Sequence, residues 1–241
     1  MRKIRHIGMR HRIAGVAGAL LVIGGGSALG VAVSAQQHAP QPSASAAGSI
    51  GPRGASRVPA IGPTLPRSEP VSIDIPAIGV RSSLLHLGLN PNGTLQVPPL
   101  FAEPSEAAWY KYSPTPGQAG SSIIEGHVDT YKGPSVFFRL GALVPGDTVD
   151  VTLADGTVAV FRVTGVRMYP KTDWPWRTVF AQTRYAALHL ITCGGDFDYS
   201  TGHYLSNVVV FASLVGARRA PPPGKTASQG SSGKLTEAAA V

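Results

Sequence analysis

Six short apolar segments, rich in β-branched residues, are spread along the middle of the chain: residues 71–75, 122–124, 148–153, 158–163, 188–192 and 207–212. Several of them alternate apolar with polar residues, and a period of two residues is typical of β-strands. No stretch carries a sustained 3.6-residue amphipathic pattern, and residues 135–140 are expected to form at most one or two helical turns. The pattern predicts a mainly β domain of seven to nine short strands. Closure into a barrel, complete or nearly so, would leave few strand edges unpaired.

Two turn signals separate these segments. Asp155-Gly156 lies between the segments 148–153 and 158–163 and is a strong two-residue hairpin signal. Pro145-Gly146 marks a second turn, directly before a strand. We therefore expect the fourth segment to fold back on the third.

The N-terminal part of the chain has a different pattern. Residues 13–33 carry no charge, and 21 helical residues span about 31 Å, roughly the thickness of bilayer hydrocarbon. Residues 1–12 are basic and are expected to stay in the cytoplasm, which makes 13–35 a transmembrane anchor. The alternative is a signal peptide cleaved near Ala35 and secretion of the rest. Both interpretations place the remainder of the chain outside the cell.

Two segments have the composition of disordered chain. Residues 36–67 are dominated by Pro, Ser, Ala and Gly and contain no aromatic residue, so we expect a linker. Residues 217–241 contain three consecutive prolines and a Ser/Gly run, and are expected to be a disordered tail. The domain that carries the function is then 68–216.

The formal charge of +8 raises the question of nucleic-acid binding. Residues 68–216 hold nine of the 21 basic and twelve of the 13 acidic residues, a balance of about −3. A nucleic-acid domain needs a dense basic face, so this class of partner is excluded.

The chain contains a single cysteine, Cys193, which excludes an internal disulfide and a cysteine-based zinc site. It ends an apolar segment in LHLITCGGDFD, and two glycines allow the backbone to turn sharply after it. One interpretation is a small buried residue. The other is a nucleophile, because an unpaired thiol in an exported protein is open to oxidation.

A nucleophilic cysteine needs a group that accepts its proton. His127 in IIEGHVDT is the best candidate, because it follows an apolar strand and a glycine at the rim of the fold. We expect its ring within about 4–7 Å of the Cys193 sulfur, since such pairs are often looser than a hydrogen bond without substrate. Asp129 either orients His127 or caps a turn.

The other histidines of the domain have different expected roles. His203 is a reserve candidate in the loop after Cys193, whereas His189 faces away from its leucine neighbours and is expected to be a structural or surface residue. His86 is expected to be partly buried with its polar atoms satisfied.

Three acids and two tryptophans have competing interpretations. Glu125, Asp196 and Asp198 are possible metal ligands, but acids this close together in a loop more often form a solvated turn. We therefore expect no metal site and no cofactor. Trp174-Pro175-Trp176 is either a lid that packs on the barrel or one wall of a substrate groove.

Taken together, these motifs resemble the sortases, membrane-anchored cysteine transpeptidases of Gram-positive bacteria. Leu190-Ile191-Thr192-Cys193 matches the cysteine motif of the family, and 126–130 resembles its histidine segment. The sequence after Cys193, with Gly-His-Tyr and then Asn-Val-Val-Val, is most similar to the actinobacterial class F branch. The resemblance covers roughly residues 69–216.

The resemblance implies a closed eight-stranded β-barrel with the cysteine and the histidine at neighbouring strand ends. It implies that Cys193 attacks an LPxTG-type sorting signal after its threonine and forms a thioacyl enzyme. His127 is then the general acid and base. The implied partners are a surface-protein sorting signal and an amine from a peptidoglycan precursor or another protein.

One feature departs from the family. Sortases usually place an arginine at the start of the strand after the cysteine loop, but no arginine occurs between Cys193 and Arg218. The sequence leaves open which group stabilises the oxyanion in its place. The candidates are His203, Asn207, the backbone N–H of the turn at Gly194, and an arginine from elsewhere, such as Arg177 or Arg184.

Two other functions compete with transpeptidation of surface proteins. One is an L,D-transpeptidase acting on peptidoglycan, although Ile191-Thr192 does not match the residues which those enzymes place before their cysteine. The other is a surface domain with weak or no catalysis that binds a peptide along a sheet edge.

Overall fold

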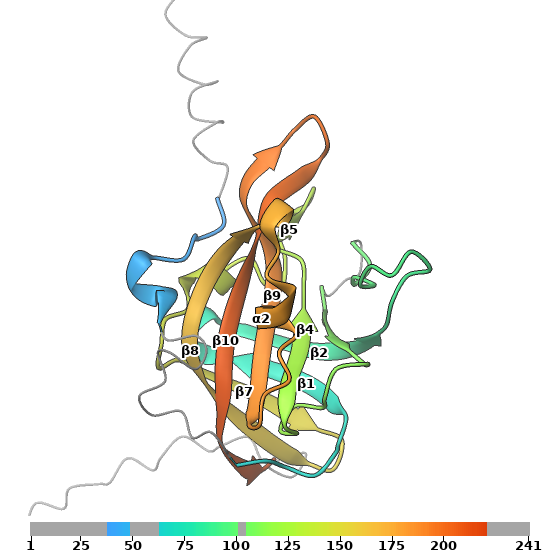
Figure 1. The fold of residues 1–241 in the computed structure, drawn as a ribbon, viewed down its shortest axis with the longest axis vertical. Helices are drawn as coiled ribbons and strands as arrows, with labels where there is room; N and C mark the ends of the chain where they lie inside the picture. The colour runs from blue at the N-terminus through green and yellow to red at the C-terminus, as the bar shows by residue number, and fades with distance from the viewer. Residues whose placement is uncertain (1–37, 49–62, 101–104, 221–241) are drawn as a thin grey trace, which may run out of the picture. The chain divides into compact units, whose positions relative to one another are not determined.

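The computed structural model describes residues 38–48, 63–100 and 105–220, and its main feature is a closed β-barrel (Figure 1). Eight strands follow each other around the barrel in the order β1-β2-β3-β4-β9-β10-β8-β7. Their bounds are Pro70–Ile75 (β1), Val80–Leu87 (β2), Ala107–Tyr110 (β3), Gly120–Glu125 (β4), Thr148–Leu153 (β7), Thr157–Pro170 (β8), Ala186–Asp198 (β9) and His203–Arg219 (β10). The predicted mainly β fold with an eight-stranded closed barrel is confirmed.

The remaining elements are short. Asp129–Thr130 (β5) and Gly133–Pro134 (β6) form a separate two-stranded sheet. The helical elements are Ala44–Ala47 (η1), Pro76–Ile78 (η2), Leu140–Ala142 (η3), Lys171–Asp173 (η4) and Trp176–Val179 (α2). The helical turns expected over 135–140 were therefore misplaced: residues 136–139 form turns, and the 3-10 helix begins at Leu140.

Most neighbouring strands of the barrel run antiparallel, whereas β2·β3 and β4·β9 run parallel. The hairpin β7–β8 turns at Asp155-Gly156, where Gly156 has a φ of 80°, so the predicted turn is confirmed. Each of the eight barrel strands has a neighbour on both sides, but the pairing does not extend along whole strands: β9 continues to Asp198, whereas its last pair with β4 is at Ile191.

The core fills the inside of the barrel, where the apolar positions of each strand meet. Ile73 of β1, Val151 of β7, Phe161 of β8, Leu190 of β9 and Val210 of β10 all belong to this cluster and are almost fully buried. Because side chains alternate along a strand, the residues between these positions face outward.

A second, smaller apolar cluster lies on the outer face of the sheet. Its buried members are Ile123, Val179, Ile191, Val209 and Phe211, with Tyr110, Tyr169, Trp174 and Phe180 packed around them. Val179 comes from α2, which is drawn over β9 in Figure 1. The loop between β8 and β9 thus covers part of the faces of β4, β9 and β10.

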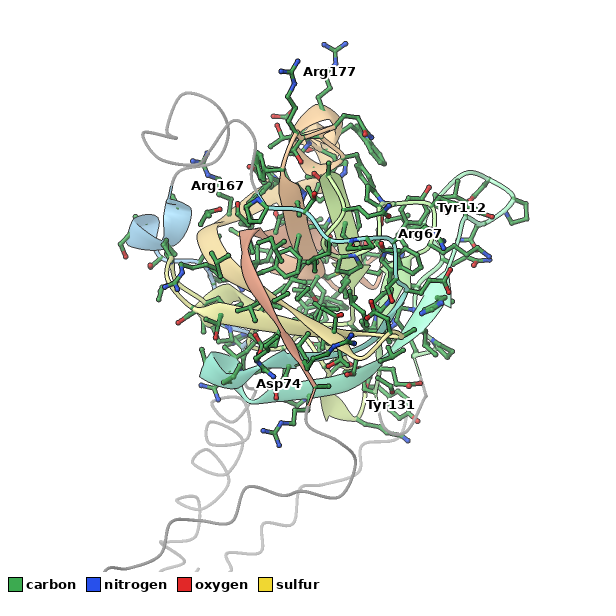
Figure 2. All side chains as sticks on the ribbon, turned by 90° about the horizontal axis from the view of Figure 1, so that it is seen from below. Arg67, Asp74, Tyr112, Tyr131, Arg167 and Arg177 are labelled. Atoms are coloured by element: carbon green, nitrogen blue, oxygen red, sulfur yellow. The ribbon has the colours of Figure 1, made fainter. Side chains whose placement is uncertain are left out.

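Part of the segment expected to be linker packs on the barrel. Ser43 Oγ accepts a hydrogen bond from the N–H of Ala46 and caps the 3-10 helix η1, and Ala46 is 1% exposed. Arg167 of β8, which lies beside this segment in Figure 2, donates from Nε to the carbonyl oxygen of Ala47. At the other end, β10 continues to Arg219, beyond the expected domain end at 216.

The described residues include no helix with the length and apolar character needed to cross a membrane. The expected anchor, residues 13–35, lies outside the described residues, as does the basic segment 1–12.

Candidate active site

Cys193 lies on β9 with its side chain partly exposed. Leu188 and Leu190 point into the barrel core, so His189, Ile191 and Cys193 point to the outer face. The thiol is therefore open to solvent at the rim of the outer cluster. Its glycine neighbour, Gly194, is buried, and a Cβ there would lie 2.8 Å from Cγ2 of Val208, so the packing requires glycine.

The two strands beside β9 bring polar side chains to the same position. Asn207 of β10 is directly opposite Cys193. On the other side, β4 runs parallel to β9 with Glu125 opposite Ile191, and the N–H of Gly126 donates to Ile191 O at 3.1 Å. The ladder ends there, because β4 stops at Glu125 and His127 lies two residues beyond it. The expected distance between the His127 ring and the Cys193 sulfur stays a prediction.

His127 is held by one hydrogen bond. Its Nε2 lies 2.7 Å from the carbonyl oxygen of Pro98. Because a carbonyl oxygen only accepts, Nε2 carries a proton, which leaves Nδ1 as the basic nitrogen of the neutral ring. The ring is partly buried and thus has a defined orientation.

Asp129 contacts Tyr204, which the sequence reasoning did not single out. The hydroxyl of Tyr204 donates to Asp129 Oδ2 at 2.5 Å. Burial, the hydrogen bond to Asp129 and the negative charges of Asp129 and Cys193 raise the pKa of Tyr204. Asp129 therefore ties the turn after β4 to the hairpin β9–β10. Among the described residues it makes no hydrogen bond to His127. The only sequence signal for Tyr204 was its place in the Gly-His-Tyr segment.

The candidates for the oxyanion group differ in their distance from Cys193. Asn207 and Gly194 are its direct neighbours, across the ladder and along the strand. His203 is exposed and pairs with Asp198, five residues beyond Cys193 on β9, which is about 16 Å along a strand. The structure thus brings Asn207 and Gly194 to the cysteine and leaves His203 farther out on the hairpin.

None of the arginines considered as substitutes lies at Cys193. Arg177 is exposed and points away from the body of the molecule (Figure 2). Arg184 precedes β9 by two residues, which puts it about 30 Å along the strand from Cys193. Arg218 donates to Asp150 Oδ2 at 2.5 Å. The cation beside the sulfur is Lys171, whose Nζ lies 3.6 Å from Sγ, and nothing in the sequence pointed to it.

Glu125 is a buried carboxyl on the outer face of β4, two residues after Ile123 of the outer cluster. It is 8% exposed, between Ala108 of β3 and Ile191 of β9. Burial raises the pKa of Glu125 to about 8, so the neutral acid is its main form at pH 7.

The metal-site interpretation of the acids finds no support. Asp198 accepts hydrogen bonds from the N–H and the Oγ of Ser200, as expected for a solvated turn. In the described part of the chain, no three His, Cys, Asp or Glu side chains gather into a possible metal site.

The remaining candidates are structural. His189 is buried on the outer face, where its Nδ1 donates to the Val179 carbonyl oxygen at 2.6 Å, and burial lowers the pKa of His189 to about 4. His86 Nε2 bonds to Pro70 O at 2.7 Å, so its polar atom is satisfied as expected. Trp174 packs on the outer cluster, whereas Trp176 is 64% exposed and stacks on Phe180.

Comparison with known protein families decides the class of the barrel. The model of the sortase domain matches residues 73–215, more than half of the chain. The chain belongs to the sortase family. Sortases are cysteine transpeptidases, and Cys193 is the only cysteine available for this chemistry.

Solved sortase structures are similar to the chain at low identity. Sortase A of Listeria monocytogenes is 18% identical, with 64% of this chain and 92% of that chain covered and a TM-score of 0.47. An SrtA sortase of Actinomyces oris is 21% identical, with 73% and 98% covered and a TM-score of 0.47. Sortase C1 of Streptococcus agalactiae is 20% identical, with 60% and 66% covered and a TM-score of 0.46. The search of curated proteins finds no match.

Proposed function

We propose that this sortase cleaves an LPxTG-type sorting signal after its threonine and transfers the acyl group to an amine of the cell envelope. Residues 13–35 anchor it in the membrane, with residues 1–12 in the cytoplasm and the barrel outside. The observation that carries the proposal is a partly exposed Cys193 on a strand of a sortase barrel, with β4, the strand that precedes His127, in parallel register beside that strand.

In the first half of the reaction, the basic nitrogen of His127 takes the thiol proton. The Cys193 sulfur then attacks the threonyl carbonyl carbon, and the electron pair of the C=O bond moves to the oxygen. When the oxyanion collapses, the C–N bond breaks, and the His127 imidazolium gives its proton to the leaving amine. A thioester and the released tail of the signal remain.

In the second half, an amine attacks the thioester carbon. His127 takes a proton from the amine, the C–S bond breaks, and the imidazolium then gives the proton to the Cys193 thiolate, which restores the starting thiol and imidazole. The acyl group is now bound to the acceptor through an amide.

The test is to incubate the described domain or the full chain with a peptide that carries an LPxTG-type signal and to measure intact mass after acid quench. We expect an adduct equal to the peptide up to its threonine, together with the free tail. Cys193→Ala removes the adduct completely. His127→Ala lowers its rate of formation by about 10²–10⁴, the usual contribution of a general acid or base.

Three outcomes contradict the proposal. A Cys193→Ala protein that still transfers the peptide to triglycine shows that the thiol is not the nucleophile. A protein that leaves sorting peptides untouched but cross-links muropeptides through Cys193 is an L,D-transpeptidase instead. Peptide binding that survives alkylation of Cys193, without any turnover before it, indicates a binding domain.

A further inference from the structure

The site lacks the arginine that a sortase needs beside its nucleophile. No arginine occurs from 194 to 217, and the nearest one beyond, Arg218, is paired with Asp150. The acyl transfer nevertheless places a negative charge first on the sulfur and then on the carbonyl oxygen. A fixed positive group that faces both lowers the barrier of the reaction.

The strand order of the barrel brings Lys171 to this place. Pro170 ends β8 opposite Ser206 of β10, and Ser206 is in turn opposite Gly194, the residue after the nucleophile. Lys171 follows Pro170 and starts η4, so its backbone lies level with the cysteine, two strands away. The long side chain bridges the strand between them, and Nζ reaches 3.6 Å from Sγ.

The ammonium group of Lys171 is not paired with an acid in the part of the chain that the structure describes. No ion pair among the described residues includes Lys171, whereas Arg67, Arg81 and Arg218 each have a carboxylate partner. Its side chain is exposed, so the ammonium group stays hydrated, and holding the charge at this place costs little desolvation free energy. A lysine ammonium is a compact point charge that does not require one bonding direction, so it can follow the negative charge from sulfur to oxygen.

We propose that Lys171 is a catalytic residue that takes the place of the arginine: it pairs with the Cys193 thiolate and then binds the oxyanion of the tetrahedral intermediate. The inference rests on the thioacyl reaction proposed above. The sulfur and the oxygen are bonded to the same carbon in that intermediate, so a cation at the sulfur is also within reach of the oxygen. Asn207 remains as a neutral donor, whereas the N–H of Gly195 already donates to Gln41 Oε1.

The first experiment compares Lys171→Met, which keeps the length of the side chain, with Lys171→Arg, which keeps the charge. We expect Lys171→Met to lower kcat for thioester formation by about 10²–10³, with little change in KM, as for the loss of one oxyanion donor. Lys171→Arg is expected to retain activity within about tenfold of the wild type. Arg177→Met removes an exposed cation that points away from the molecule and serves as the matched control, with unchanged kcat.

The second experiment needs no substrate and separates this inference from the proposed function. Alkylation of Cys193 is measured with anionic iodoacetate and with neutral iodoacetamide, and the ratio of the two rates is compared. A cation near the sulfur attracts the anion, so Lys171→Met is expected to lower the ratio about fivefold, the Coulomb effect of a unit charge at this distance in water. Arg177→Met leaves the ratio unchanged.

The outcomes are distinct. A Lys171→Met enzyme with wild-type kcat overturns the inference, even if the alkylation ratio falls. An unchanged ratio overturns it as well, because the ammonium is then not at the sulfur. If no sorting peptide acylates the wild-type protein, the proposed function fails. The ratio of the two alkylation rates then decides by itself whether Lys171 faces the thiol.

Discussion

The two faces of β9 use the same strand for different purposes. On the inner face, Ala186, Leu188 and Leu190 are almost fully buried in the barrel core. On the outer face, His189 lies under α2, and Cys193 reaches solvent at the rim. The inner face is wholly apolar at these positions, whereas the outer face carries two titratable side chains, His189 and Cys193.

The difference shows how the barrel separates stability from chemistry. Alternation along the strand lets the inner side chains pack to interior density without any constraint from the reaction. The outer side chains are free to include a thiol, an imidazole and a carboxyl, because the core does not depend on them. Substitutions on the two faces are therefore expected to affect different measurements.

The largest effect is expected for Leu190→Ala on the inner face. Leu190 is 0% exposed, and removing its side chain leaves a cavity in the closed barrel, which costs about 2–5 kcal/mol of unfolding free energy. Val179→Ala in the outer cluster is the comparison: α2 is short and can settle onto the smaller side chain, so we expect less than half of that cost. Urea unfolding of both variants measures the difference. Equal losses would show that the two faces are not separate.

The next effect concerns pH and Glu125. Burial raises the pKa of Glu125 in the folded protein to about 8, above its ordinary 4.5, so between these values the folded state binds more protons than the unfolded state. The contribution of Glu125 protonation to the unfolding free energy is complete below pH 4.5 and is lost as the pH rises through 8. From pH 6 to 8 the wild type should lose roughly 2 kcal/mol through this group.

Glu125→Gln keeps the shape of the side chain and removes the titration. Its unfolding free energy should depend less on pH over the same range, as measured by urea unfolding at several pH values. A wild type and a Glu125→Gln protein with the same pH dependence would mean that the carboxyl is hydrated in the folded state, and that the outer face is more open than its burial indicates.

The smallest effect is expected for Trp176→Ala. Trp176 is 64% exposed and its main contact is the stack on Phe180, with ring centroids 5.4 Å apart. We expect the unfolding free energy to change by no more than about 0.5 kcal/mol, as for most surface substitutions. If the residue is a wall of the groove, KM for the sorting peptide rises about two- to tenfold, the usual worth of an aromatic contact. An unchanged KM assigns Trp176 to the lid alone.

The elements that depend on local signals were predicted well. Alternating residues and Asp155-Gly156 predicted the hairpin β7–β8, because period and turn chemistry are both written within a few neighbouring residues. The apolar run before Cys193 likewise predicted the core part of β9. Cys193 and His127 were selected as strand-end residues. The structure places Cys193 inside β9, which continues to Asp198, and His127 two residues after the end of β4, the parallel neighbour of β9.

The elements that depend on distant pairing were missed. β2 reads VRSSLLHL and lacks clear alternation, and β3 has only four residues. They form strands because they pair in parallel across a long connection, with Leu84 opposite Ala107, and such a contact leaves no local pattern. Lys171 was missed for the same reason: its place beside the sulfur depends on the order β9-β10-β8. The burial of Glu125 depends on β3, which covers its other side.

Cys193 is the only sulfhydryl in the chain, and it lies at the accessible rim of the outer face. A thiol-reactive fluorine or nitroxide tag will therefore label the natural sequence at one site, the sulfur of Cys193. Magnetic resonance signals from that tag will report the motion of β9 around Cys193, without an engineered attachment point and without competing labels elsewhere.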